Sequence, residues 1–177
     1  MSKPLIVYVG GDMLKKGSQL LRKQEKQKLR DLGFTPYAPQ DDKEINDKQN
    51  QSVEQNNSLA DKIFYKDTEG MLNADILIFE VDNNNVGTVA EIGQWAMIHH
   101  LAKRNQSDIY LRSLADKPIF FHSTDIRDTT IEETGYARSH SYNQYLIGAV
   151  NACSYTGKIN TWEEIEQELI KLKEKLL

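Results

Sequence analysis

The side chain best suited to chemistry in this sequence is the carboxylate of Glu91, in the segment 85–93, which reads NVGTVAEIG. Two interpretations of Glu91 are open. Thr88 and Glu91 have the spacing of a capping box, in which Glu91 would only help a helix to begin. Alternatively, a carboxylate in the first turn of a helix is stabilised as an anion by the helix dipole, which is what a carboxylate nucleophile requires at neutral pH.

Further candidate residues lie directly after runs of apolar residues that are expected to form strands. In a parallel sheet flanked by helices, ligands bind at the carboxyl ends of the strands. The three segments concerned are 10–12, 82–91 and 123–143. None of them contains the glycine pattern of a dinucleotide-binding or phosphate-binding loop. Aspartates at strand ends could approach a ligand, although aspartate is also common at turns. They are Asp12, Asp41, Asp82 and Asp125.

Histidine and cysteine side chains are poorly placed for a metal site. His99 and His100 are adjacent and would point to different faces of a helix, and His122 and His140 lack the spacing of metal ligands. The single cysteine, Cys153, excludes an internal disulfide and is expected to be a small buried apolar group. We therefore expect neither a metal nor a cofactor.

Strands and helices alternate along the sequence. Apolar runs predict strands at 5–9, 34–38, 75–81, 118–122 and, weakly, 155–159, and Pro36 favours an edge position for the second of them. Helical spacing predicts helices at 14–32, 88–103, 139–152 and 161–177, and one that begins at Ser58 with Asp61 as its capping partner. This alternation predicts a doubly wound, flavodoxin-like α/β fold, with a parallel sheet of about five strands and helices on both faces.

The length indicates a single domain over residues 1–177. Within it, residues 41–57 are almost entirely polar and are expected to form a mobile loop, either a lid or an insertion. Residues 161–177 begin with a capping box formed by Thr161 and Glu164 and continue as an amphipathic helix. The helix at 14–32 is expected to turn its leucines inward and its basic residues toward solvent.

The composition limits the classes of partner. The 177 residues include 22 Lys and Arg against 26 Asp and Glu, so the formal net charge is -4 at pH 7. Because nucleic-acid polymers are bound through positively charged surfaces, we expect no such partner. No apolar run approaches the ~18 residues of a membrane span, and no signal peptide is recognisable. We therefore expect a cytoplasmic protein with no membrane partner.

Several segments, taken in order, resemble the nucleoside 2-deoxyribosyltransferase family. The strand IVYVGG at 6–11 resembles the opening strand of the family, and DTEGMLNAD at 67–75 resembles the segment whose aspartate precedes the central strand. The stretch GTVAEIG at 87–93 resembles the nucleophile motif. TDIR at 124–127, followed by YN at 142–143, resembles the segment from which an asparagine reaches the site of a neighbouring subunit.

The resemblance implies an enzyme of nucleotide salvage that transfers a 2-deoxyribosyl group between nucleobases. By this resemblance Glu91 is the nucleophile, Asp67 manages the proton of the nucleobase, and Tyr8 orients Glu91. A sugar held covalently by a carboxylate can be passed to a second base instead of being lost to water. Asp67 would serve as the acid if burial or a neighbouring carboxylate raised its pKa. The implied partners are small deoxynucleosides and free nucleobases.

The substrate-binding residues that the resemblance implies are Gly10, Asn85, Gly87 and Asn143, with Asp82 as an acidic neighbour. Asn143 would bind the terminal hydroxyl of the sugar across a subunit interface, so a homo-oligomer with shared active sites is expected. Asn85 stands where the family commonly has an aspartate. Its amide can still bond a hydroxyl but brings no charge.

Two other functions stay open. An N-glycosidase that hydrolyses deoxynucleoside 5′-monophosphates would hold the phosphate with serines and an arginine, for which Ser18 and Arg22 are the candidates. A non-catalytic nucleotide-sensing module would use Glu91 only as a capping residue. An incubation of a deoxynucleoside with and without a second base discriminates among these functions.

Overall fold

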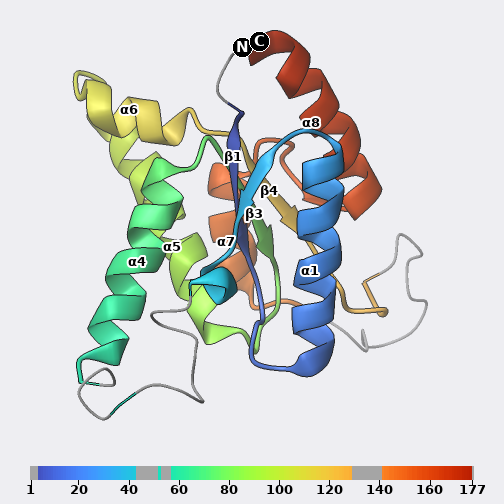
Figure 1. Ribbon diagram of the computed structural model, residues 1–177. Helices are drawn as coiled ribbons and strands as arrows, with labels where there is room; N and C mark the ends of the chain where they lie inside the picture. The colour runs from blue at the N-terminus through green and yellow to red at the C-terminus, as the bar shows by residue number, and fades with distance from the viewer. Residues whose placement is uncertain (1–3, 43–51, 53–56, 129–140, 177) are drawn as a thin grey trace, which may run out of the picture. The chain divides into compact units, whose positions relative to one another are not determined.

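The computed structural model describes residues 4–42, 52, 57–128 and 141–176 (Figure 1). These residues have the predicted α/β architecture, with six α-helices and a five-stranded parallel sheet in the strand order β2-β1-β3-β4-β5. The chain divides into two compact units, residues 1–77 and 78–177. Most of the predicted loop at 41–57 lies outside the described residues, so its mobility stays a prediction.

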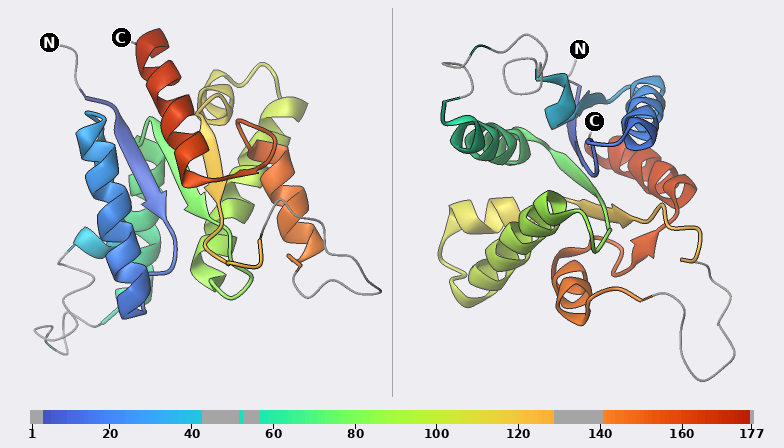
Figure 2. Two further views of the ribbon diagram at one scale, coloured as in Figure 1. Left: turned by 90° about the vertical axis from the view of Figure 1, so that its right-hand side faces the viewer. Right: turned by 90° about the horizontal axis from the view of Figure 1, so that it is seen from below.

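The first unit contains β1 (Ile6–Gly10), α1 (Lys16–Asp31), β2 (Thr35–Tyr37), the 3-10 turn η1 (Pro39–Asp41) and α4 (Leu59–Asn73). β1 and β2 are parallel, with Tyr8 opposite Tyr37. β2 is an edge strand, as Pro36 predicts. Figure 2 shows α1 and α4 on either side of β1, so helices cover both faces of this strand.

The inward face of α1 differs from the predicted one. Its buried side chains are Arg22, Glu25, Lys26 and Leu29, whereas Leu20 is 62% exposed. The Arg22 guanidinium donates to Glu25 Oε1 at 2.8 Å and to the carbonyl oxygen of Gly10 at 3.3 Å. Charged groups can be buried when they are paired in this way. The expectation that the basic residues of this helix face solvent is therefore wrong for Arg22 and Lys26.

α4 begins close to the predicted residue, but not through the predicted cap. Ser58 has a left-handed backbone, with φ of 59°, and its side chain makes no capping hydrogen bond, so the predicted Ser58–Asp61 pair is wrong. Further along, Gly70 lies where the ring of Tyr37 packs against the helix. A Cβ added at Gly70 would lie 2.4 Å from Tyr37 Cε1, so only glycine permits this close approach.

The second unit contains α5 (Val86–Arg104), α6 (Ile109–Ala115), β4 (Ile119–His122), α7 (Gln144–Cys153), β5 (Ile159–Asn160) and α8 (Trp162–Leu176). β3 (Ile76–Glu80) crosses the boundary between the units, and all five of its residues are buried, as expected of a central strand. α5 packs against both α6 and α7. Figure 2 shows α8 on the other side of β4 from α5. Across the described ranges, no helix combines the length and the apolar character that crossing a membrane requires.

Two helices of the second unit begin at asparagine or aspartate caps that the apolar pattern does not reveal. α7 begins later than predicted because Asn143 Oδ1 accepts hydrogen bonds from the backbone N–H groups of Tyr145 at 2.9 Å and Leu146 at 3.2 Å. α6 is a helix that the sequence analysis missed. Asp108 Oδ1 caps it by accepting from the Leu111 N–H at 2.9 Å.

The predicted capping box of the last helix is confirmed. The backbone N–H of Glu164 donates to Thr161 Oγ1 at 3.2 Å, and the backbone N–H of Thr161 donates to Glu164 Oε2 at 3.0 Å. The predicted apolar face is buried at Ile165, Leu169 and Leu172. Local sequence alone therefore determines how this helix begins and which face it buries.

Candidate active site

The nucleophile candidate Glu91 lies on α5, but not in the first turn, where both interpretations of the sequence placed it. The helix begins at Val86 with Asn85 as its N-cap, and Thr88 is a buried residue of the first turn whose N–H donates to Asn85 Oδ1 at 3.5 Å. Thr88 therefore does not cap the helix, and Glu91 lies in the second turn. The capping box of Thr88 and Glu91 is wrong, and so is the placement of Glu91 in the first turn.

Glu91 does not cap α5, because the first turn of that helix contains no acidic residue. The side chain is half-buried. Helix capping therefore does not explain the glutamate at this position.

Asn85 combines a structural and a potential binding role. Its Oδ1 caps α5, while its Nδ2 is buried and has no hydrogen-bond partner among the described residues. An unsatisfied buried amide donor costs free energy unless a ligand or water accepts its hydrogen. Gly87, two residues later, would tolerate a Cβ, whose nearest neighbour is Asn85 Oδ1 at 3.9 Å. Packing within the described chain therefore does not require a glycine at this position.

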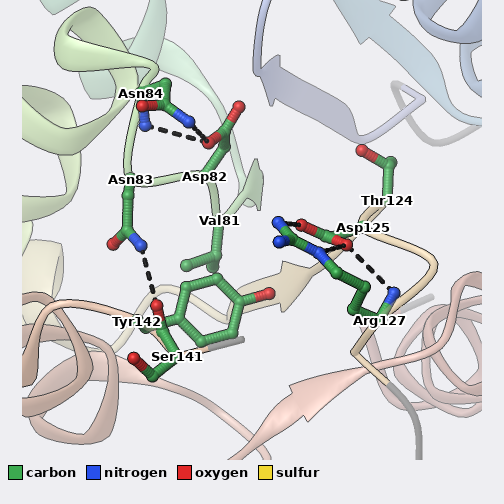
Figure 3. A pocket seen from close by; sticks show the side chains of 9 residues that line it. All are labelled: Val81, Asp82, Asn83, Asn84, Thr124, Asp125, Arg127, Ser141 and Tyr142. Carbon is green, nitrogen blue, oxygen red and sulfur yellow. Dashed lines mark hydrogen bonds and ion pairs between the residues drawn. The ribbon is translucent and has the colours of Figure 1, made fainter. Parts of the chain in front are cut away.

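A polar pocket of about 440 Å³ lies beyond the carboxyl ends of β3 and β4 (Figure 3). Its lining residues come from the turn after β3, the segment after β4 and the segment before α7. They are Val81, Asp82, Asn83, Asn84, Thr124, Asp125, Arg127, Ser141 and Tyr142. This is the place in an α/β sheet where ligands bind.

The turn after β3 joins two of the predicted binding residues. Asp82 Oδ1 accepts from the backbone N–H of Asn84 at 2.9 Å, which holds the turn in shape. Asn83 Nδ2 donates to the carbonyl oxygen of Ser141 at 3.0 Å, and Asn83 Oδ1 accepts from the backbone N–H of Asn143 at 2.9 Å. Asn83 therefore connects the turn that contains Asp82, which lines this pocket, to Asn143, which lines the neighbouring groove.

Asn143 is exposed, and its Oδ1 is occupied by the cap of α7. Only its Nδ2 remains as a donor toward a ligand, because one amide oxygen already accepts two backbone hydrogens. An apolar groove of about 550 Å³ adjoins it between α5 and α7, with Val89, Gly93 and Leu146 among its lining residues.

Two further polar groups of this pocket are already paired. The Arg127 guanidinium binds Asp125 through Nε–Oδ1 at 2.9 Å and Nη2–Oδ2 at 2.5 Å (Figure 3). The hydroxyl oxygen of Tyr142 lies 2.6 Å from Ser123 Oγ and 2.8 Å from Asp128 Oδ2. Burial raises the pKa of Tyr142 well above its ordinary value of 10, so this hydroxyl stays protonated and can donate.

In the first unit, Tyr8 and Gly10 lie on β1. Tyr8 is fully buried and stacks on Tyr37, with the ring centroids 5.9 Å apart. A buried tyrosine hydroxyl usually has a hydrogen-bond partner. Gly10 is the last residue of β1, and its carbonyl oxygen accepts from Arg22.

Asp67 has the raised pKa that an aspartate needs in order to act as an acid. Burial raises the pKa of its carboxyl group, and the negative charge of Asp42 raises it further, from the ordinary 3.8 to about 6. Asp67 Oδ1 is buried and has no hydrogen-bond partner among the described residues. Asp67 therefore holds a proton at higher pH than an ordinary aspartate does.

Sequence reasoning missed two residues around Asp67. Tyr37 packs on α4 at Gly70 and stacks on Tyr8, so it joins the helix that contains Asp67 to the strand that contains Tyr8. Asp42 follows η1 and pairs with Lys66 Nζ at 2.8 Å. The tyrosine had a weak sequence signal, because Gly70 inside a helix indicates a close approach. Asp42 had none, because its partners lie on α4, far away in the sequence.

The chain is similar to known proteins in both sequence and structure. The family model of nucleoside 2-deoxyribosyltransferase matches residues 7–140. The fold is similar to a structure described as a 2-deoxyribosyltransferase from Bacillus psychrosaccharolyticus, with 16% identity, a TM-score of 0.55, and coverage of 91% of this chain and 90% of that one. It is also similar to a conserved protein from Enterococcus faecalis V583, with 21% identity, a TM-score of 0.61, and coverage of 97% and 99%. No match was found among curated protein sequences. Because the family model matches most of the length of this chain, the chain belongs to the nucleoside 2-deoxyribosyltransferase family.

Proposed function

We propose that this protein transfers a 2-deoxyribosyl group between nucleobases through a covalent glycosyl-Glu91 intermediate. The observation that carries the proposal is the carboxyl group of Asp67, whose pKa burial and Asp42 raise to about 6. The family requires an acid at this position, and the chain provides the environment that makes an aspartate act as one. Membership of the family supports the nucleoside and nucleobase substrates.

The proposed reaction has two displacements. A carboxylate oxygen of Glu91 attacks the anomeric carbon of the sugar, the glycosidic C–N bond breaks, and its electron pair goes to the base nitrogen. Asp67 donates the proton that the leaving base takes up. In the second step a nitrogen of the incoming base attacks the same carbon, the bond to Glu91 breaks, and Asp67 receives the proton released by the incoming base.

The remaining residues hold the substrate in this proposal. Tyr8 orients the Glu91 carboxylate through its hydroxyl. The orphaned Nδ2 of Asn85 donates to a sugar hydroxyl, which would satisfy the buried amide described above. Gly10 and Gly87 let the backbone come close to the substrate. Asp82 is an acidic neighbour of the bound sugar.

Asn143 is proposed to bind the terminal hydroxyl of the sugar in the site of a neighbouring subunit. Its exposure and its remaining Nδ2 donor are compatible with such a contact. A homo-oligomer would then be required for full activity. Sedimentation at the assay concentration tests this, and a fully active monomer would disprove the shared site.

A hydrolase of deoxynucleoside 5′-monophosphates is the rival function, and the structure weighs against its phosphate ligands. Arg22 is fully buried and paired with Glu25, and Ser18 Oγ donates to Asp12 Oδ2 at 2.9 Å. In the polar pocket, Arg127 is bound to Asp125. Of the described residues, the guanidinium groups of Arg22 and Arg127 are thus already engaged by carboxylates.

We therefore expect deoxyadenosine to be a better donor than its 5′-monophosphate. The phosphate of the monophosphate would lie near the carboxylates of the proposed site, and like charges a few ångströms apart cost roughly 1 to 4 kcal/mol. The specificity constants for the two donors should therefore differ by about tenfold to several hundredfold. Equal specificity constants, or a preference for the monophosphate, would favour the hydrolase.

The proposed function is tested by incubating the protein with deoxyadenosine alone and with deoxyadenosine plus a different free base, followed by chromatography. Base exchange predicts a new deoxynucleoside that forms only when the second base is present. Release of adenine and free sugar at the same rate in both incubations would show hydrolysis instead. No turnover in either would leave the nucleotide-sensing module as the better hypothesis.

A further inference from the structure

The chain that leaves β2 is anchored to two helices by a pair of ion pairs. Lys26 Nζ on α1 lies 2.6 Å from Asp41 Oδ1, and Lys66 Nζ on α4 lies 2.8 Å from Asp42 Oδ2. The Asp42 side chain is only 19% exposed, so its carboxylate is held in a partly dry environment. Charges in such places interact more strongly than they do at the open surface.

Asp42 and Asp67 act on the same small region of the first unit. Asp67 and Gly70 lie three residues apart and therefore share a face of α4, and the Tyr37 ring packs against Gly70. Burial raises the pKa of Tyr37 above 10, and the negative charges of Asp67, Asp42 and Asp41 raise it further. Tyr37 therefore lies within the electrostatic reach of both carboxylates.

The charged and titratable groups around Asp67 can be named for each element. η1 and the residue after it supply Asp41 and Asp42, β2 supplies Tyr37, and α4 supplies Lys66. Of these groups, Asp42 is the one whose charge acts on the Asp67 carboxyl, in the same direction as burial. Lys66, which would oppose it, is paired with Asp42.

We propose that Asp42 is a positioning residue for Asp67: its carboxylate, held in place by Lys66, keeps on Asp67 the proton that the leaving nucleobase receives. This inference rests on the proposed function for its catalytic consequence. The electrostatic coupling that it requires between the two carboxylates can be measured without any substrate.

The test is the substitution Asp42→Asn, which keeps the size of the side chain and removes its charge. Without that charge, and with Lys66 no longer neutralised, Asp67 should lose its proton at a pH lower by about 0.5 to 1. The alkaline limb of the kcat/KM profile for the deoxynucleoside should move by the same amount. Activity should then fall about threefold to tenfold at pH 8 and change by less than about twofold at pH 5.

Two variants make the test specific. Asp41→Asn removes the neighbouring carboxylate of the same turn and should leave the titration of Asp67 unchanged. Lys66→Met removes the cation that offsets Asp42, so it should move the titration of Asp67 to higher pH. Opposite shifts in Asp42→Asn and Lys66→Met cannot arise from a general loosening of the turn, and either variant alone suffices if the other does not fold.

Carboxyl ¹³C NMR of isotopically labelled protein reads the titration of Asp67 directly, with Asp67→Asn to assign the resonance. An unchanged or upward-shifted Asp67 titration in Asp42→Asn, or an equal shift in Asp41→Asn, would overturn the proposal. If the wild type exchanges no bases, the proposed function fails, and the NMR titration still decides whether Asp42 controls Asp67. A shifted titration with an unshifted kcat/KM profile would refute the catalytic part.

Discussion

Replacement of Asp67 by asparagine should stabilise the folded protein at neutral pH, because the folded chain holds this carboxylate in an unfavourable environment. The pKa of Asp67 is about 6 in the folded protein against an ordinary 3.8. At about 1.4 kcal/mol for each pKa unit, the difference sets an upper limit of about 3 kcal/mol. Asp67 is only half-buried, so solvent screening reduces the expected gain to about 1 to 2 kcal/mol.

The sign of the pH dependence follows from proton binding. Because the folded state binds the Asp67 proton more tightly than the unfolded state, the stability of the wild type falls as pH rises from about 4 to about 6. The advantage of Asp67→Asn should therefore be absent near pH 4, grow through this window and be constant above about pH 7. Urea unfolding of both proteins at several pH values measures it.

Asp61→Asn is a matched control on the same helix. Asp61 lies in the first turn of α4 and is exposed, so its loss should cost a few tenths of a kcal/mol to about 1 kcal/mol and give no gain at neutral pH. If Asp67→Asn is less stable than the wild type at pH 7.5, or if its advantage is the same at pH 4 and pH 7.5, the environment inferred for Asp67 is wrong.

Two further substitutions test the fold. Gly70→Ala places a Cβ 2.4 Å from the Tyr37 ring and should cost about 1 to 3 kcal/mol in thermal or urea unfolding, whereas Gly17→Ala, with nothing within 4 Å of the new atom, should be neutral or stabilising by up to about 1 kcal/mol. Equal effects of the two substitutions would contradict the contact. Thr161→Ala removes one half of the confirmed capping box and should lower stability by about 1 kcal/mol, and an unchanged unfolding midpoint would show that the cap is not needed.

The parts of the fold that were predictable are those determined by residues that lie close together in the sequence. The capping box at Thr161 and Glu164 and the buried face that follows it need only a few consecutive residues. The predicted start of α5 was wrong because Asn85 and Thr88 can both cap a helix. The spacing of Thr88 and Glu91 matches a capping box, and this pattern favoured Thr88 over Asn85. Only the folded turn after β3 shows that Asn85 Oδ1 is in position to accept.

The parts that were not predictable depend on contacts between distant segments. Arg22 faces inward because Glu25 and the carbonyl oxygen of Gly10 are both within its reach, and helical spacing alone places a charge on the outside. The sequence could name Asp67 only through a resemblance, since the carboxylate that raises its pKa belongs to Asp42, after β2. The raised pKa of Asp67 is thus a tertiary property, whereas the helices and strands are largely determined by local sequence.

Glu91 is proposed to carry the sugar between the two bases. Peptide mass spectrometry after rapid quenching of the protein with deoxyadenosine alone, for the wild type and for Glu91→Gln, tests this role. Because Glu91 takes no part in capping α5 and glutamine keeps the size of the side chain, this substitution should leave folding nearly intact. We expect a 2-deoxyribosyl adduct on the peptide that contains Glu91, which disappears when a second base is added and does not form in Glu91→Gln. An adduct on another residue, or base exchange by Glu91→Gln at the wild-type rate, would contradict it.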